Sequence, residues 1–449
     1  MHKNLVMAMM AGAVTWVVAP RVADACGGCF VPPAENTQVT GHRMILSVSP
    51  EQTTLYDQIE YSGNPEQFAW VLPTRGIVDV GVSSDLVFNQ LGFDTTVNVS
   101  PPPLDCDWSL CQNEDAGFGS SSATSGSGGS GAPNGGVDVV ASEVVGPFET
   151  VQLQATDPQA LNDWLDGHGY NIPAEIEPII ADYVNNGFGF LAMKLVPGVG
   201  VDKMQPVRIS TPGAAPTLPL KMVAAGTGNT TTMTLYVVGE GRYEPANFPG
   251  FTIGEDELVW NWDDNISNYR DLRQARYDES DGFAWQSEAS LSYSVMGFRS
   301  SILNVLDFVG VEGSGYETTD EQTAYEAAKE DLDVLFAGMN PNAVMVTRLR
   351  AELSRAALAE DLTLTAASDQ SVLPTSLQAK KATGTWPPCP CGGGSSDPEA
   401  PKPLPRGNRL ITAGSGCNVE APSGGAGGLG GLALAGVFGL WAIRRRRAA

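Results

Sequence analysis

Apolar residues in the first part of the chain recur at the spacing of β-strands. In residues 44–48, the apolar Met44, Leu46 and Val48 occupy every second position, so they fall on one face of a strand. A Ser-Pro-Glu turn (49–51) leads into a second strand over residues 55–61. Residues 68–73 (Phe-Ala-Trp-Val-Leu-Pro) are continuously apolar, which predicts a strand that is buried on both faces. This part of the chain is therefore predicted to form a sheet.

Helical periodicity alternates with strands further along the chain. Asp157 is a predicted N-cap, with Pro158 in the first turn of its helix. Apolar residues at helical spacing predict further helices over residues 84–91, 173–185 and 318–339. Segments with the Thr and Val content of antiparallel strands lie over residues 137–154 (two strands), 188–196, 207–210, 218–224 and 232–238.

These elements predict an α+β fold, with a largely antiparallel sheet and inserted helices, in one globular domain over residues 26–375. Residues 117–136 are almost entirely Gly, Ser, Ala, Asn and Pro, so we expect a flexible loop inside this domain. Residues 376–423 become rich in Pro, Gly and Ser, which predicts a spacer before the C-terminal tail.

Residues 1–25 have the three parts of a secretory signal peptide. A basic residue precedes an apolar stretch, and the small-x-small triplet Ala-Asp-Ala (23–25) predicts cleavage after Ala25. A retained membrane helix is disfavoured because the stretch is short and Pro20 ends it. The export machinery is therefore a predicted partner, and lipid modification of the new N-terminal Cys26 is an alternative.

The tail over residues 424–449 predicts a membrane-spanning or sorting segment. Its apolar run is rich in glycine, and a helix of about 20 residues spans about 30 Å, which just crosses a bilayer. The arginines that follow should stay cytoplasmic and leave the domain outside. A Gly-Cys pair precedes the run and four arginines follow it: Gly416, Cys417, Arg444, Arg445, Arg446 and Arg447.

This order of Gly-Cys pair, apolar run and arginine cluster resembles the MYXO-CTERM sorting signal of myxobacterial surface proteins. The resemblance concerns only the end of the chain, and it implies processing near Cys417 by a sorting protease and transfer to the cell surface. An ordinary tail anchor in the inner membrane is the alternative. In both cases the protein is expected at the cell envelope or cell surface, attached to the membrane at least transiently.

Seven cysteines are present, and six form three close pairs once Cys417 is assigned to the tail signal. An even number in an oxidising compartment predicts structural disulfides. Local pairing is favoured for the C-G-G-C and C-x4-C pairs, while C-G-G-C as a redox motif is the alternative. The three pairs are Cys26 and Cys29, Cys106 and Cys111, and Cys389 and Cys391.

The charge balance and the shortage of histidine exclude several classes of function. With 26 basic and 51 acidic residues the net charge is −25, which repels phosphate backbones, so no nucleic-acid partner is expected. Only His42 and His168 lie outside the signal peptide, so a histidine-based zinc site is not expected. A Ser-His-Asp triad would need one of these two residues, and both are predicted to be ordinary surface residues.

An aromatic and acidic segment beyond residue 239 suggests two ligands. Asp281 lies in a stretch that resembles a calcium loop, but the EF-hand template fails because its first ligand position would be Tyr277. A looser calcium site that uses Asp263, Asp264 or Asp281 stays an alternative, and no other cofactor is expected. Exposed tryptophans here could bind glycan, although burial in a core is the commoner role of tryptophan.

Several short motifs, in order along the chain, resemble an exported bacterial family called domain of unknown function 2330. The resemblance covers roughly residues 25–370. Because the family has no known activity, it implies no ligand or catalytic residue. The motifs are residues 25–30 (Ala-Cys-Gly-Gly-Cys-Phe), 68–73, 161–165 (Leu-Asn-Asp-Trp-Leu), 169–170 (Gly-Tyr), 183–184 (Tyr-Val) and 190–195 (Phe-Leu-Ala-Met-Lys-Leu).

The sequence therefore favours an exported, envelope- or surface-anchored protein with a structural or binding role, such as adhesion or envelope maintenance. A secreted hydrolase is the first alternative, and it predicts a pocket with two carboxylates about 5 to 10 Å apart with raised pKa values. A thiol–disulfide exchange protein is the second, and it predicts Cys26 or Cys29 partly exposed at the start of a helix.

Overall fold

The computed structural model describes residues 29–30, 38–62, 69–106, 138–169, 174, 176–197, 204–224, 229–309 and 319–389. Within these residues, no helix combines the length and the apolar composition that crossing a membrane requires. Several predicted features lie outside them: the signal peptide with Ala25, Cys26, Cys111, the loop 117–136, Cys391, and the tail with Gly416, Cys417 and Arg444 to Arg447.

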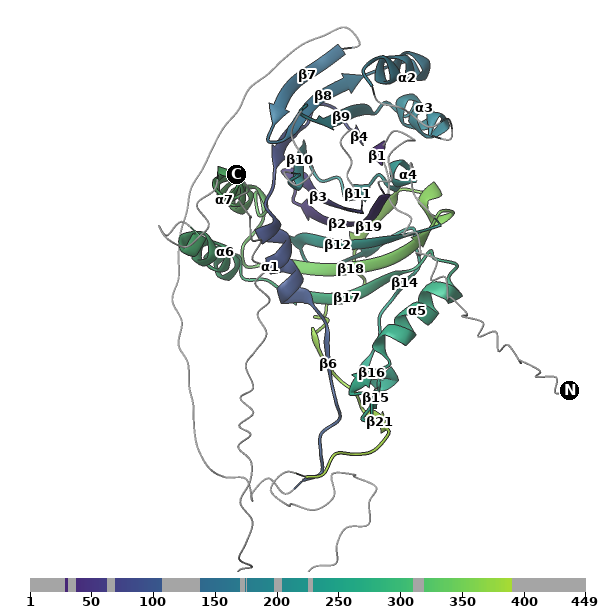
Figure 1. Ribbon diagram of the computed structural model, residues 1–449, viewed down its shortest axis with the longest axis vertical. Coiled ribbons are helices and arrows are strands. Elements are labelled where there is room, and N and C mark those ends of the chain that lie inside the picture. Colours follow the sequence, from purple (N-terminus) through teal and green to yellow (C-terminus); the bar gives the residue numbers. More distant parts are fainter. Residues whose placement is uncertain are drawn as a thin grey trace, which may run out of the picture. The chain divides into compact units, whose positions relative to one another are not determined.

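The largest sheet has eight strands and contains the hairpin predicted near the N-terminus (Figure 1). All of its pairs are antiparallel except β12 with β2 and β14 with β17. The predicted α+β fold, largely antiparallel, is confirmed. The order of strands is β14 (Gly250–Phe251), β17 (Trp285–Ser292), β18 (Val344–Ser354), β12 (Thr230–Glu240), β2 (Gln38–Val48), β3 (Gln52–Ser62), β10 (Val207–Pro212) and β5 (Asp79–Val82).

A second sheet of five antiparallel strands contains the continuously apolar strand β4. In β4, Trp70 and Leu72 pack into one core cluster and Val71 packs into another, so the prediction of a strand buried on both faces is confirmed. The order of strands is β1 (Cys29–Phe30), β4 (Ala69–Thr74), β9 (Gly189–Leu195), β8 (Phe148–Gln154) and β7 (Asp138–Val145).

The two sheets pack face to face, and helices cover their outer faces. The core between the sheets joins Met44 and Leu46 of β2 with Trp70 and Leu72 of β4. Helices α2 (Pro158–Gly167) and α3 (Glu177–Asn185) cover the five-stranded sheet, and α1 (Asp85–Thr95), α6 (Val295–Val309) and α7 (Thr319–Val334) cover the eight-stranded sheet. The alternation of side chains along each strand thus separates the core between the sheets from the two helical layers.

Shorter elements complete the described part of the chain. Residues 218–224 were predicted as a strand, but only Leu218 is in β11, and a helical turn follows because Pro219 cannot continue the ladder. Two strands, β20 and β21, also lie past residue 375, in the segment that the sequence predicts to be a spacer. The shorter elements are α4 (Leu220–Val223), α5 (Tyr269–Glu279), β6 (Asn98–Ser100), β11 (Thr217–Leu218), β13 (Tyr243–Pro245), β15 (Val259–Asn261), β16 (Ile266–Ser267), β19 (Leu362–Ala366), β20 (Ser376–Gln378), β21 (Lys381–Thr383) and the 3₁₀ turns η3 (Glu255–Glu257) and η4 (Ala357–Ala359).

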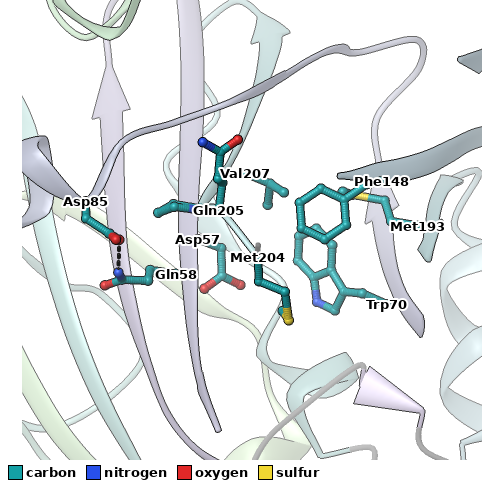
Figure 2. A pocket seen from close by; sticks show the side chains of 10 residues that line it. Asp57, Gln58, Trp70, Asp85, Phe148, Met193, Met204, Gln205 and Val207 are labelled. Carbon is teal, nitrogen blue, oxygen red and sulfur yellow. Dashed lines mark hydrogen bonds between the residues drawn. The ribbon is translucent and has the colours of Figure 1, made fainter. Parts of the chain in front are cut away.

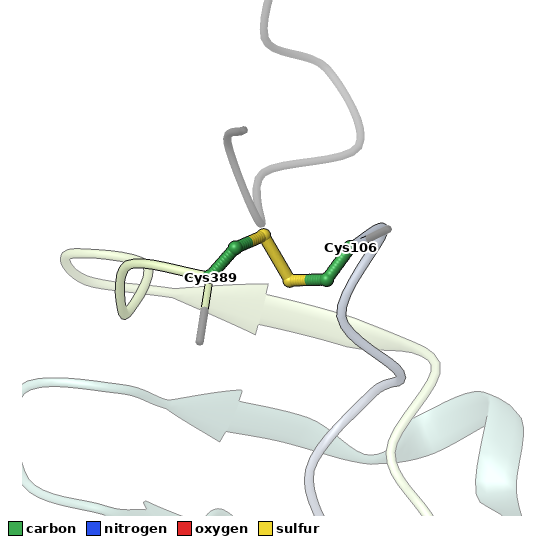
Figure 3. Close-up of a disulfide and its surroundings, with 2 residues drawn as sticks. All are labelled: Cys106 and Cys389. Atoms are coloured by element: carbon green, nitrogen blue, oxygen red, sulfur yellow. A yellow bond between two sulfur atoms is a disulfide. The ribbon is translucent and has the colours of Figure 1, made fainter. Parts of the chain in front are cut away.

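A disulfide joins Cys106 to Cys389 across a sequence separation of 283 residues (Figure 3). The local pairing of Cys106 with Cys111 predicted from their spacing is therefore wrong. The chain segments that carry the two cysteines approach each other through β6 and β20, which pair in parallel. Spacing along the chain could not reveal this pairing, because it depends on contacts between distant segments.

We predict that Cys106→Ser destabilises the protein by about 2–5 kcal/mol, because a cross-link over so long a loop strongly restricts the unfolded chain. Urea unfolding under non-reducing conditions measures the loss. Cys389→Ser should give the same loss and Cys111→Ser should give little. A large loss of unfolding free energy in Cys111→Ser, with none in Cys389→Ser, would instead support pairing of Cys106 with Cys111.

A buried ion-pair network holds α7 against the eight-stranded sheet. Asp331 in α7 is completely buried and accepts hydrogen bonds from Arg208 Nη1 at 3.1 Å and from Ser83 Oγ at 2.7 Å. The guanidinium also reaches Glu330 at 2.7 Å. A Cβ atom at Gly81 would lie 2.5 Å from Arg208 Nη2, so glycine is needed there for the arginine to fit. These contacts connect three elements that are distant in sequence.

Burial raises the pKa of Asp331 to about 6, more than Arg208 and its hydrogen-bond donors lower it. Between pH 4 and pH 6 the folded protein therefore binds a proton that the unfolded chain has released, so stability falls as the pH rises through this window. We predict that Asp331→Asn removes this part of the slope, and that Glu330→Gln keeps it. Unfolding free energies measured at several pH values test this, and parallel curves for wild type and Asp331→Asn would contradict it.

Candidate functional site

A pocket of about 170 Å³ opens where β10 begins beside β3. Figure 2 shows Asp85 and Gln58 at one side and the aromatic rings at the other, with Asp57 and Met204 between them. Polar and apolar groups thus occupy different walls of the pocket. Its lining consists of Asp57, Gln58, Trp70, Asp85, Phe148, Met193, Met204, Gln205, Pro206 and Val207.

The deepest polar group of the pocket is the carboxylate of Asp57. Its Oδ1 is hydrogen-bonded to Nδ1 of His42 at 2.8 Å, and both side chains are 1% exposed. His42 was predicted to be a surface residue, and this prediction is wrong. The position of His42 in a central strand explains the error, because its side chain points into the core between the sheets.

The second carboxylate, Asp85, lies at the exposed edge of the pocket. Ser84 caps the helix that begins at Asp85, and Gln58 donates a hydrogen bond to the Asp85 carboxylate. Partial desolvation raises the pKa of Asp85 above its usual value, more than the charge of Arg43 and the hydrogen bond from Gln58 lower it. Because the side chain is solvent-exposed, this rise in pKa corresponds to only a small free energy.

The opposite wall of the pocket is apolar and aromatic. Trp70 and Phe148 are 3% and 2% exposed, and Met193 and Met204 lie beside them. Aromatic faces carry negative partial charge, and the sulfur of methionine is readily polarised. This wall can therefore contact both hydrocarbon groups and organic cations.

A smaller cavity of about 20 Å³ adjoins the pocket and includes His42. Asp57 and Trp70 line both spaces. The other described residues around the small cavity are apolar, and none of its lining residues is Ser, Thr or Cys. A catalytic triad needs a hydroxyl or thiol nucleophile beside the histidine, so this lining does not complete one.

The remaining predicted site residues are not brought together. His168 is exposed and stacks on Trp164 at the end of α2, as predicted for a surface residue. Cys29 lies in β1 rather than at the start of a helix, so it does not have the position that the thiol-exchange reading predicted.

The three calcium candidates have local structural roles. Asp263 accepts a hydrogen bond from the backbone of Thr385, Asp264 accepts one from Asn261, and Asp281 adopts a left-handed turn with φ of 51°. In the part of the chain that the structure describes, no group of three or more His, Cys, Asp or Glu side chains could hold a metal ion.

Comparison with known proteins identifies the family. The model of a family described as an uncharacterized protein conserved in bacteria (DUF2330) matches residues 20–365, which is most of the chain. The chain belongs to DUF2330. The residues of the pocket lie within the matched region, as does the whole core between the two sheets.

Two further comparisons add no functional information about this DUF2330 protein. No match was found among curated proteins. Among solved structures, a mutated baculovirus P35 after caspase cleavage is similar over 46% of this chain and 69% of that chain, with 10% sequence identity and a TM-score of 0.24.

Sequence reasoning missed the residues of the pocket. Asp57 follows Leu55 at the strand period, so an acidic side chain lies on the apolar face of a central strand. His42 breaks the same face of the neighbouring strand. Two polar residues on one buried face were a signal that the two could be partners, whereas Met204 and Phe148 reach the pocket only through the tertiary fold.

Proposed function

We propose that this protein is exported, is held at the cell envelope or surface, and uses its pocket beside β3 and β10 to bind a small organic cation. The binding part of the proposal depends on one observation: two carboxylates and an aromatic wall line the same pocket. The location is proposed from the sequence patterns at the two ends of the chain.

Charge favours a cation over an anion or a neutral ligand. Asp57 and Asp85 place two acidic groups around the pocket, and Arg43, which hydrogen-bonds Gln58, offsets part of this charge. The chain as a whole carries a net charge of −25, which attracts cations from solution. A cation with an apolar body can approach the exposed Asp85 while its methyl or methylene groups contact Trp70 and Phe148.

A hydrolase remains the second candidate, because a pocket with two carboxylates was its predicted sign. The geometry supports it less well than binding. Asp57 is hydrogen-bonded to His42 and almost fully buried, so its charge can attract a cation at a distance, but it cannot touch a substrate as a general acid or base must. Asp85 alone, with its raised pKa, cannot supply the pair of carboxylates that glycoside hydrolysis uses.

We predict that choline binds to the purified domain and that Asp85→Asn weakens its affinity roughly fivefold, because a partly solvated ion pair contributes up to about 1 kcal/mol. Titration calorimetry at low salt measures both constants. The exposed Asp163 in α2 gives a matched control, since Asp163→Asn removes the same charge away from the pocket.

The neutral carbon isostere of choline should bind more weakly than choline itself. Equal affinity for the two compounds, or equal losses in Asp85→Asn and Asp163→Asn, would remove the support for a cation site. Turnover of chromogenic glycosides that is abolished in Asp85→Asn would favour the hydrolase instead.

The proposed location is tested separately by intact mass analysis of protein from fractionated cells. We predict a product that begins at Cys26 and is found in the envelope or surface fraction, because both ends are expected to be processed or anchored during export. A full-length product in the cytosol, with all its cysteines reduced, would contradict export.

A further inference from the structure

A second pocket, of about 110 Å³, lies at the other end of β4. Aliphatic, proline and aromatic side chains make most of its walls, among them Leu46, Leu55, Leu72 and Ile209. Its charged lining groups are Arg75 and Asp361. The pocket is therefore mainly apolar, with one cation and one anion at its boundary.

Arg75 is the group of this pocket that is available to a ligand. Its side chain is exposed, and its guanidinium lies 4.1 Å from the centre of the Phe188 ring. No acidic side chain among the described residues forms an ion pair with it. In a chain with about twice as many acidic as basic residues, such a cation at a pocket is well placed to hold an anion.

The acid of the pocket is already engaged. Asp361 Oδ1 accepts hydrogen bonds from the hydroxyl of Tyr183 at 2.5 Å and from the backbone nitrogen of Lys221 at 3.1 Å. The Lys221 ammonium is also near and interacts favourably with the Asp361 charge. These contacts reduce the influence of Asp361 on a ligand and leave Arg75 as the dominant charge.

The small cavity of His42 lies between the second pocket and the first and shares lining residues with each of them. Leu55, Leu72 and Pro219 line both the second pocket and the small cavity, and Asp57 and Trp70 line both the small cavity and the first pocket. On β3, the lining residues from Thr53 to Asp57 span four residues, about 13 Å at the rise of a strand. These three neighbouring spaces form a seam between the sheets, from Arg75 past the His42–Asp57 pair to Asp85.

We infer that this seam binds an amphiphile with an anionic head and a straight apolar chain, with the head at Arg75 and the chain directed toward Asp57. A peptide strand fits less well, because most of the lining is apolar and two of its four threonines, Thr53 and Thr74, already donate their hydroxyls to backbone carbonyls. Most amides of a bound strand would then lack hydrogen-bond partners. A methylene chain has no such groups, and it gains free energy from every carbon that it buries.

The buried His42–Asp57 pair sets the length of the ligand. A chain that reaches this pair meets polar atoms instead of hydrocarbon, so a further methylene gains less from burial there than it gains among the leucines. Affinity should therefore rise about fourfold for each added methylene and then stop rising once the chain spans about 13 Å.

Titration calorimetry with hexanoate, octanoate and decanoate, each below its micellar concentration, tests the inference. Affinity should increase along the series, and Arg75→Gln should weaken octanoate binding about tenfold, because a charge-assisted contact is lost. The exposed Arg270 in α5 supplies the control, since Arg270→Gln changes the net charge equally but should leave binding unchanged. Octanamide, which has the same chain and a neutral head, should bind more weakly than octanoate.

Equal losses in Arg75→Gln and Arg270→Gln, or equal affinity for octanoate and octanamide, would overturn the inference. An affinity that does not depend on chain length would overturn it as well. This site is independent of the proposed cation pocket: Arg75→Gln should not change choline binding, and Asp85→Asn should not change octanoate binding. Either proposal can therefore fail while the other holds.

Discussion

The packing of β4 against the eight-stranded sheet is the interaction on which the rest of the described structure depends. Trp70 and Leu72 point into the core between the sheets, while Val71 points into the core beneath α2 and α3. One strand of six residues therefore contributes to two cores. Because β4 is apolar on both faces, the hydrophobic effect favours a position in which the eight-stranded sheet covers one face and α2 and α3 cover the other. Burial of β4 therefore holds the two sheets together.

Spaces nevertheless remain between the two packed sheets. Interiors are normally filled as densely as organic crystals, so neighbouring cavities along one seam need a cause. His42 and Asp57 supply one, since their polar atoms gain no hydrogen bonds from apolar neighbours and therefore do not favour tight packing by leucines. The pair divides the seam, with carboxylates on one side and an apolar channel that ends at Arg75 on the other.

Local patterns predicted most of the strands and helices before residue 240, and the helix α7, because strand alternation, helix caps and continuous apolar runs are properties of neighbouring residues. Ser84 and Asp157 cap helices close to where the sequence places their starts, and β4 is buried as expected. What local patterns could not supply is partnership: the parallel pairing of β12 with β2, the joining of Cys106 to Cys389, and the burial of His42. Each of these depends on segments far apart in the chain, which is also why the pocket residues were missed.

The two ends of the seam relate differently to the charge of the whole protein. A net charge of −25 raises the local concentration of cations and lowers that of anions, so long-range attraction assists the pocket at Asp57 and Asp85 and opposes the pocket at Arg75. An anionic ligand must then be held by short-range contacts, and in an apolar pocket those contacts scale with the hydrocarbon that is buried. Salt screens the long-range term at both ends, which weakens the attraction at the cation site and the repulsion at the other. The sign of the net charge therefore sets opposite long-range terms at the two pockets, while salt also weakens the local contact at the exposed Arg75.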